Sequence, residues 1–398
     1  MITYSDGKTT YSDGDSLSGD LGKKVRCGDK DALQKLKDFA ANRDPEQPHS
    51  QARALYELAE VYFNGFCEVE RSPQEALKLL IQAAELDDDL ASIRLAKFYR
   101  DGKQGFKQEG QKALNLFIKA AEHGNNNGWR LAAEMFREGK GGLKADGYRA
   151  IEFYEKLDAL DDKQALINIA EICEEGCGKF KADGLRALEI YEDIIRHGKY
   201  WVKVNLDFGI ESPVLQNYKE ALRNAARLYL EGKAGVVPNG YKAIEYLTEL
   251  VKDDGENLRR IADIYLEGKA GVEPDGYKGI EYLTEIIERN ETETLFTSPS
   301  DAMKILADIW RNAKGGVTQD GYKAVEYLTL LAEEDDSSNW VSCKPNQALY
   351  ELGTIYEDGC GSVAPDMQKA IDFYQKSAKL GYGFAKRKIK ELTRLGIV

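Results

Sequence analysis

The three histidines, His49, His123 and His197, are the residues of this sequence best suited to acid–base chemistry. A general base must lie within hydrogen-bond reach of the reacting group. His123 and His197 instead recur at one position of a repeated pattern, near the expected end of a helix, where an imidazole favours the helix dipole. The sequence has neither a glycine-rich phosphate loop after a strand nor a nucleophile elbow. We therefore predict a protein that is not an enzyme, with no catalytic residue and no cofactor.

Cysteine spacing offers one arrangement that could bind a metal. Cys173 and Cys177 are four residues apart, which on a continuous helix would place two thiols on one face. No second Cys or His pair follows at zinc-ligand spacing, and Gly176 between them is expected to end the helix. Asp-Gly pairs such as Asp146-Gly147 lack the alternating oxygen ligands and closing Glu of a calcium loop. The six cysteines are therefore predicted to be reduced thiols, with no metal site.

The elements that position these side chains follow from eight anchor positions, which are glycine in seven cases and alanine in one. The anchors are Gly65, Gly102, Gly139, Gly176, Gly232, Gly268, Ala313 and Gly359. Their separations of 37, 37, 37, 56, 36, 45 and 46 residues indicate a unit of 36 to 37 residues with three insertions. Such a period is typical of a solenoid, in which neighbouring units bury each other's apolar faces.

Each unit is predicted to hold two amphipathic helices, with the anchor at the left-handed C′ position of the first. A large side chain, usually aromatic, stands three residues before each anchor. Seven residues after the anchors stand Ser72, Glu109, Asp146, Asp183, Asn239, Asp275, Asp320 and Asp366. Seven of these eight are favoured N-cap types, so the second helix is expected to begin there. A small residue four positions later, such as Ala76 or Ala370, would let the two helices approach closely.

Composition excludes several classes of partner. The chain has 398 residues and a formal charge of −13, which disfavours nucleic-acid binding through a basic face. We find no apolar run long enough to span a membrane, and the first residues do not form a signal peptide. A cytoplasmic location is predicted, with export by a signal-peptide-independent system as an alternative.

The order of segments along the chain predicts four regions. Residues 1–20 are rich in Gly, Ser, Asp and Thr and are expected to form a flexible tail or at most a weak hairpin. Residues 21–50 hold a capping helix over 31–41 and a linker. Eight helix pairs follow over 51–381, with insertions at 199–219, 291–300 and 335–346, and residues 382–398 supply a C-terminal capping helix.

The repeated phrase resembles the Sel-like repeat (SLR), a relative of the tetratricopeptide repeat, over about residues 51–381. The segment 348–381 shows it most fully, with Leu352, Gly353, Tyr356, Gly359, Asp366, Lys369, Ala370, Ile371, Phe373, Tyr374 and Ala378. Ala313 and Gly279 depart from the pattern locally. The resemblance implies an all-α, right-handed superhelical α-solenoid that acts as an adaptor for a protein or extended peptide. A dedicated inhibitor of the immunity type, or a secreted effector that grips one partner, is the alternative function.

By analogy with the related repeat, residues nine, five, two and one positions before each anchor are expected to line the concave groove. The nine-before positions are Tyr56, Ile93, Arg130, Ile167, Arg223, Arg259, Lys304 and Tyr350. Arg130, Arg259 and Lys304 of this row are candidate partner-binding residues. The alternative is that each pairs with the acid four residues later, Glu134, Asp263 or Asp308, on a solvated face.

Two arginines break that pattern and are the best candidates for an acidic or carboxylate partner. Arg223 and Arg227 are like charges at i,i+4 and repel each other. The alternative is that Glu220 or the preceding insertion neutralises them.

The insertions are the other candidate binding region, because they all fall between the second helix of one unit and the first helix of the next. They carry Trp201, Phe208 and Trp340, together with other aromatic residues such as Tyr218. Exposed aromatic side chains are enriched at interface hot spots. The alternative is that they pack back onto the helices and seal a longer turn.

Overall fold

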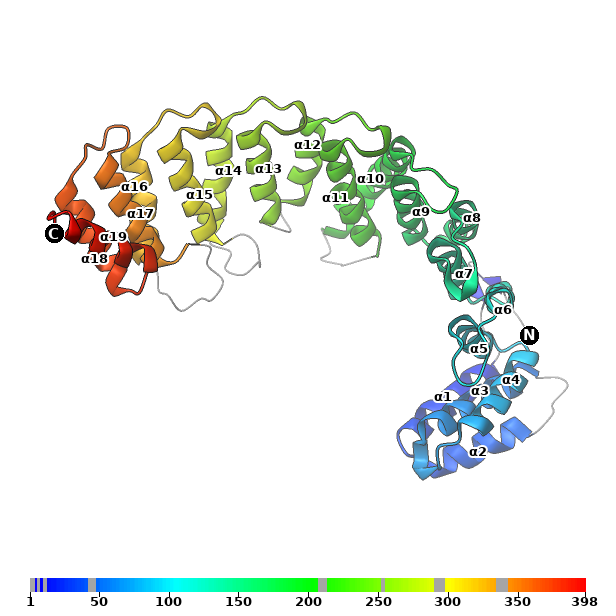
Figure 1. Cartoon of the computed structure of the whole chain (residues 1–398). Coiled ribbons are helices and arrows are strands. Elements are labelled where there is room, and N and C mark those ends of the chain that lie inside the picture. The colour runs from blue at the N-terminus through cyan, green and yellow to red at the C-terminus, as the bar shows by residue number, and fades with distance from the viewer. Residues whose placement is uncertain are drawn as a thin grey trace. The chain divides into compact units, whose positions relative to one another are not determined.

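The computed structural model of the chain (Figure 1) describes residues 4–5, 8–9, 13–41, 48–206, 213–251, 255–289, 298–333 and 343–398. It divides into two compact units, Met1–Ile190 and Tyr191–Val398. A short hairpin joins β1 (Tyr4–Ser5) to β2 (Lys8–Thr9). The α-helices are α1 (Asp13–Arg26), α2 (Lys30–Ala41), α3 (Pro48–Asn64), α4 (Pro73–Glu85), α5 (Asp89–Asp101), α6 (Gly110–Glu122), α7 (Asn127–Glu138), α8 (Gly147–Asp158), α9 (Gln164–Glu175), α10 (Gly184–Leu206), α11 (Pro213–Glu231), α12 (Gly240–Leu250), α13 (Glu256–Glu267), α14 (Gly276–Arg289), α15 (Pro299–Asn312), α16 (Gly321–Glu333), α17 (Pro345–Asp358), α18 (Met367–Lys379) and α19 (Gly383–Arg394).

Each unit is a stack of helices in which sequence neighbours are also neighbours in space. In the first unit, every helix from α3 to α8 packs against the next one along the chain. In the second unit, each helix from α11 to α18 packs against the next one, and α18 packs against α19. The prediction of an all-α solenoid of helix pairs is confirmed.

A recurring backbone hydrogen bond closes the turn between the two helices of a pair. The N-cap residue of the second helix donates its N–H to the carbonyl of the large residue near the end of the first. Asp146 donates to Phe136 at 2.8 Å and Asp366 to Tyr356 at 2.7 Å, and the corresponding bond is present in all eight pairs. The N-cap side chain then accepts the N–H three residues on, as Asp366 does from Lys369 at 3.0 Å. Glu109 is the predicted N-cap that makes no such side-chain bond.

The anchor positions adopt two different turns. Gly65, Gly102, Gly139, Gly232, Gly268 and Ala313 are left-handed, with φ between 53° and 74°, as expected. Gly176 and Gly359 also have positive φ, 75° and 77°, but their ψ of 162° and 161° lies outside the left-handed helical region, so the expected left-handed helical geometry is wrong at these two anchors. Each precedes a Cys-Gly pair, and an isolated bridge from Cys177 to Phe180, or from Cys360 to Val363, closes the loop.

A cation stacks on the aromatic ring of its own repeat in much of the array. The cation lies three residues after the N-cap, and the ring lies three residues before the anchor. The pairs are Lys112 on Tyr99 at 5.3 Å, Arg149 on Phe136 at 5.2 Å, Lys278 on Tyr265 at 4.9 Å, Lys323 on Trp310 at 3.8 Å and Lys369 on Tyr356 at 5.2 Å. The next residue is the small one, and Ala113, Ala150, Ala324 and Ala370 are completely buried. One short segment therefore positions both a cation–π contact and a close helix crossing.

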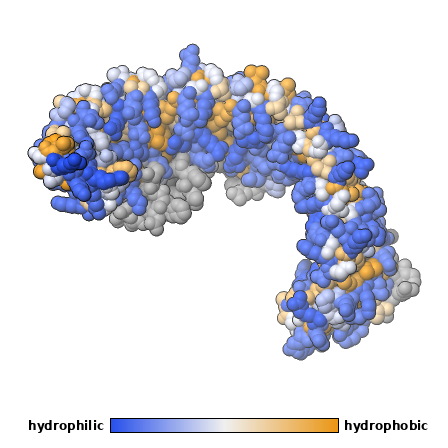
Figure 2. All heavy atoms as spheres, in the orientation of Figure 1, coloured by the Kyte–Doolittle hydropathy of each residue, from blue (hydrophilic) through white to orange (hydrophobic). Residues whose placement is uncertain are grey.

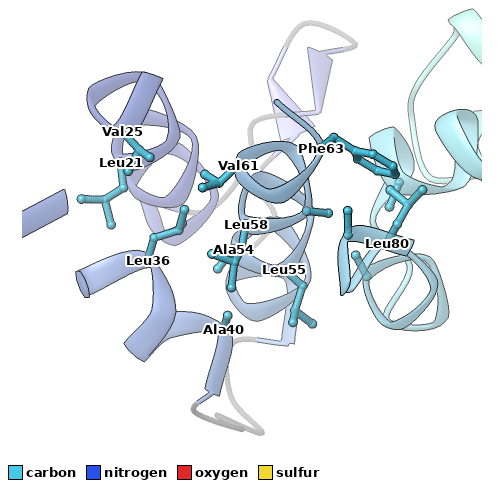
Figure 3. Packing of buried hydrophobic residues seen from close by; sticks show 14 of the residues in the cluster. Leu21, Val25, Leu36, Ala40, Ala54, Leu55, Leu58, Val61, Phe63 and Leu80 are labelled. Atoms are coloured by element: carbon cyan, nitrogen blue, oxygen red, sulfur yellow. The ribbon is translucent and has the colours of Figure 1, made fainter. Parts of the chain in front are cut away.

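The expectation of a flexible tail over residues 1–20 is corrected from Asp13 onward, where α1 begins. Leu21 and Val25 of α1 are buried, and they lie beside Leu36 and Val61 in the hydrophobic cluster that Figure 3 shows. The Ser18 hydroxyl also donates to the carbonyl of Ser50 at 3.2 Å. α1 packs against both α2 and α3, so two helices precede the first repeat where one was expected.

The insertion at 199–219 is also more helical than expected. α10 continues to Leu206 and α11 begins at Pro213, so residues 207–212 alone separate the two helices. His197 therefore lies inside α10, and its expected place at a helix end is wrong. His123 is the C-cap of α6, as expected.

Candidate binding face of the first helices

The candidate binding residues lie on the first helix of each pair. We call the residues nine positions before the anchors, from Tyr56 to Tyr350, the first-helix row. Ile93 and Ile167 in this row are buried, so the expectation that every member faces outward is wrong at these two positions. Burial also raises the pKa of the Tyr56 phenol. The partly exposed members that carry charge are the arginines and the lysine of the row.

Three row cations are neutralised by carboxylates. Arg259 pairs with Asp263 at 3.0 Å, as its i,i+4 spacing predicts. Arg130 does not take the predicted Glu134, because its guanidinium reaches Asp162, 2.5 Å away in the segment before α9. These arginines are therefore satisfied within the array.

Lys304 is the most enclosed of the row cations. Its ammonium contacts Asp308 at 2.8 Å and Glu351 of the following helix pair at 2.7 Å, with 18% of the lysine side chain exposed. Burial tends to lower the pKa of Lys304, but the hydrogen bonds to Asp308 and Glu351 outweigh it and leave the pKa above its ordinary value. A cation held by two carboxylates has little charge left for a partner.

Arg223 differs from these three residues. It is partly exposed on α11, and no carboxylate of the described residues lies within 4.0 Å of its guanidinium. Arg227, one turn later, pairs with Glu231 at 3.6 Å rather than with Glu220. Of the row cations predicted to bind a partner, Arg223 alone has no ion pair within the described part of the chain.

The insertion aromatics are only partly described. Tyr218 packs back onto the stack, since it is buried against Gly198 and donates its hydroxyl to Glu249. Lys199 reaches the same carboxylate at 2.6 Å. The side chain of Trp201, and all of Phe208 and Trp340, lie outside the described residues.

Three of the cysteines lie in surroundings that disfavour a reactive thiolate. Cys173 is buried, and the thiol of Cys177 donates to the carbonyl of Arg137 at 3.3 Å. Burial raises the pKa of the Cys173, Cys177 and Cys360 thiols, which disfavours the reactive thiolate. Within the ranges that the structure describes, no group of three His, Cys, Asp or Glu residues could hold a metal ion.

Sequence reasoning missed an aromatic cluster at the C-terminal end of the first-helix row. Tyr350 contacts Tyr374 and Tyr382, with ring centroids 5.3 Å apart in both pairs, and Phe384 at 6.3 Å. Arg387 stacks on Phe384 at 4.4 Å. The signal in the sequence was the presence of Tyr382 and Phe384 around the start of α19. The sequence alone predicts this helix only as a C-terminal cap.

In the described part of the chain, no helix is long and apolar enough to cross a membrane. Among solved structures, the chain is similar to a Sel1 repeat protein from Oxalobacter formigenes, at 17% identity and a TM-score of 0.49, covering 98% of this chain and 97% of that one. It is also similar to c5321, a protective antigen with an SLR fold in uropathogenic Escherichia coli strains, at 22% identity and a TM-score of 0.41, covering 89% of this chain and 68% of that one. An immunity protein, Pa5087 from Pseudomonas aeruginosa, matches at 14% identity and a TM-score of 0.25, covering 61% of this chain and 80% of that one. A search of curated proteins found no match.

The model of the Sel1 repeat matches seven segments, namely 52–88, 90–125, 129–157, 219–250, 258–290, 300–336 and 346–382. The segments correspond to seven of the eight helix pairs. The pair α9–α10, which carries Cys173 at the aromatic position, is not among them. Because the seven segments cover more than half of the sequence, the chain belongs to the Sel1 repeat family.

Proposed function

We propose that this chain binds a protein or an extended peptide through the exposed part of its first-helix row, without catalysing a reaction. Sel1 repeats form scaffolds for protein–protein interaction, which supports the general role. The partner, the cytoplasmic location and the part played by the insertions stay predictions from the sequence.

The observation that carries the proposal is the contrast between Arg223 and the paired row cations. Arg130, Arg259 and Lys304 each have a carboxylate within 3.0 Å. Arg223 has none within 4.0 Å among the described residues, and it has a like charge one turn away in Arg227. A partner carboxylate at Arg223 would relieve that repulsion and supply the missing ion pair. Arg223 is therefore proposed as an anchor for an acidic group of the partner.

The test is to recover a partner by affinity purification and mass spectrometry, and then to measure its direct binding to purified variants. Arg223→Glu is expected to weaken binding by at least about tenfold, whereas Arg223→Lys keeps part of the affinity because it keeps the charge. Lys24→Glu, at an exposed position of α1, is the matched control and is expected to leave binding unchanged. Equal affinity of wild type and Arg223→Glu would remove Arg223 from the site.

The insertions can be tested with the same partner. Trp340→Ala is expected to weaken binding if the third insertion contributes a hot spot, with Tyr241→Ala as the control for an exposed ring elsewhere. An unchanged affinity for Trp340→Ala would remove Trp340 from the proposed site.

A further inference from the structure

The rings of the aromatic cluster on α17, α18 and α19 differ in their exposure to solvent. Tyr374 is fully buried, Tyr350 and Tyr382 are half-buried, and Phe384 is 55% exposed. Phe384 is the most exposed of the described phenylalanines. Its ring lies 5.5 Å from that of Tyr382. The cluster therefore presents a half-exposed ring that other rings hold from behind, and the guanidinium of Arg387 stacks on this ring at 4.4 Å.

The helix that carries Phe384 is strongly basic, in a chain of net charge −13. Its cations are Lys386, Arg387, Lys388, Lys390 and Arg394. Lys388 pairs with Glu357 at 2.7 Å. For the other four, no carboxylate of the described residues lies within 4.0 Å. Figure 2 shows hydrophobic atoms directly beside strongly hydrophilic ones at the end of the chain that Figure 1 draws in red.

From this juxtaposition we infer that α19 and the rings behind it form a docking site for an acidic peptide segment that carries an aromatic side chain. The peptide ring would stack beside Phe384 on the aromatic cluster. Its carboxylates would meet Arg387 and Lys390, which are one turn apart on α19. The inference rests on the proposed protein-binding function and names the chemistry of one segment that is bound.

Charge distribution favours a short acidic peptide over a nucleic acid. Bases also stack on aromatic rings in positively charged grooves. A nucleic acid, however, carries a charge at every nucleotide, and a chain with a net charge of −13 would repel a long polyanion outside the four α19 cations that lack a carboxylate partner in the described structure. A few carboxylates around one ring match four cations that have no carboxylate partner in the described structure better than a long polyanion does.

The experiment measures binding to the full chain by fluorescence anisotropy. The probe is a labelled peptide of about ten residues with one Trp flanked by Glu, and the comparison probes are the same peptide with Lys in place of Glu and a ten-nucleotide oligothymidylate. Wild type is expected to bind the acidic peptide, more weakly as salt rises toward about 0.3 M, and to bind neither comparison probe. Absence of binding to the acidic peptide, or equal binding of the oligonucleotide, overturns the inference.

Two variants and two matched controls locate the site. Arg387→Glu with Lys390→Glu, and separately Phe384→Ala, are each expected to weaken binding by at least about tenfold. Lys24→Glu with Lys35→Glu makes the same change of charge on exposed positions of α1 and α2, and Tyr241→Ala removes a ring that is also 55% exposed. Both controls are expected to bind like wild type, and circular dichroism checks that all four variants are folded. If the α19 variants bind as tightly as the controls do, the peptide does not dock on α19.

Failure of this site is distinguishable from failure of the proposed function. A purified protein partner that binds Phe384→Ala and wild type equally, but binds Arg223→Glu weakly, keeps the proposed function and refutes the α19 site. Sedimentation of the chain without peptide tests the other possible occupant of α19, a second copy of the same chain. A dimer that Arg387→Glu with Lys390→Glu dissociates would show that a second copy of this chain covers α19, which also overturns the inference.

Discussion

Within the second unit, Lys304 is paired with carboxylates, whereas most cations of α19 have no carboxylate of the described residues near them. Lys304 is held by two carboxylates, one on its own helix and one on α17. On α19, four of five cations have no carboxylate within 4.0 Å among the described residues, and an exposed ring lies among them. The first arrangement stabilises the contact between two helix pairs. The second leaves its charge available to a partner.

The difference teaches that a count of charges along a repeat does not locate a binding site. Lys304 and Arg259 were predicted to contribute to binding, yet their charges are balanced within the array. Arg223 and four cations of α19 differ because no carboxylate of the described residues lies near them. This difference is seen only when the neighbours of each cation in space are known.

The largest expected effect is that of Lys304→Met, which leaves Asp308 and Glu351 close together without their shared cation. We expect the free energy of unfolding to fall by about 2 kcal/mol, less than for a fully buried pair because Asp308 is partly exposed. Urea unfolding of the two proteins measures the change, and Glu351→Gln in the variant is expected to recover part of it. A loss no larger than that of Lys386→Met on α19 would abolish the distinction between the two regions.

The pH dependence of this difference has a defined sign. Since the pKa of Lys304 is raised in the folded protein, its contribution is complete below the pKa of an unfolded lysine and is lost as the pH rises through the raised value. The two proteins should therefore differ by a constant amount between about pH 7 and 9 and converge in strongly alkaline solution.

The parts of the fold that could be predicted from the sequence are those fixed by local chemistry. A glycine at φ of 65°, as at Gly102, and an Asp that caps a helix, as at Asp366, depend on a few adjacent residues. α1 could not be found in this way, because Gly19 and Gly22 lower its helix propensity. Its glycine at 22 instead allows close approach to Glu57, since a Cβ there would collide with that side chain.

The candidate site was less predictable than the fold, because its charges are balanced over long distances in sequence. Asp162 is 32 residues from Arg130, and Glu351 is 47 residues from Lys304. The i,i+4 rule found Asp263 for Arg259, but it assigned Glu134 to Arg130, which takes a partner beyond its own repeat. How the repeats stack decides such pairs, and a single repeat does not contain that information.

Lys388 provides an intermediate test inside α19, because it is the one cation of this helix that has a carboxylate partner among the described residues. Lys388→Met is expected to lower the free energy of unfolding by about 1 kcal/mol, because the pair of Lys388 and Glu357 is mostly buried. The loss is limited because Glu357 still accepts the hydrogen bond from the Tyr374 hydroxyl at 2.6 Å. Urea unfolding provides the measurement, with Lys386→Met as the unpaired control on the same helix. Equal losses of unfolding free energy in both variants would mean that the ion pair of Lys388 does not stabilise the fold more than an unpaired cation of α19 does.

The smallest expected effect has the opposite sign. Lys386, Lys390 and Arg394 are spaced four residues apart, so Lys390 repels a like charge on both sides. Lys390→Gln is therefore expected to raise the free energy of unfolding by about 0.5 kcal/mol at low salt, and the gain should shrink as salt screens the repulsion. The same variant should bind the acidic peptide less tightly. A cation that costs stability and supports binding is what a functional surface retains, whereas a loss of stability in Lys390→Gln would place Lys390 with Lys304 among the cations that hold the fold.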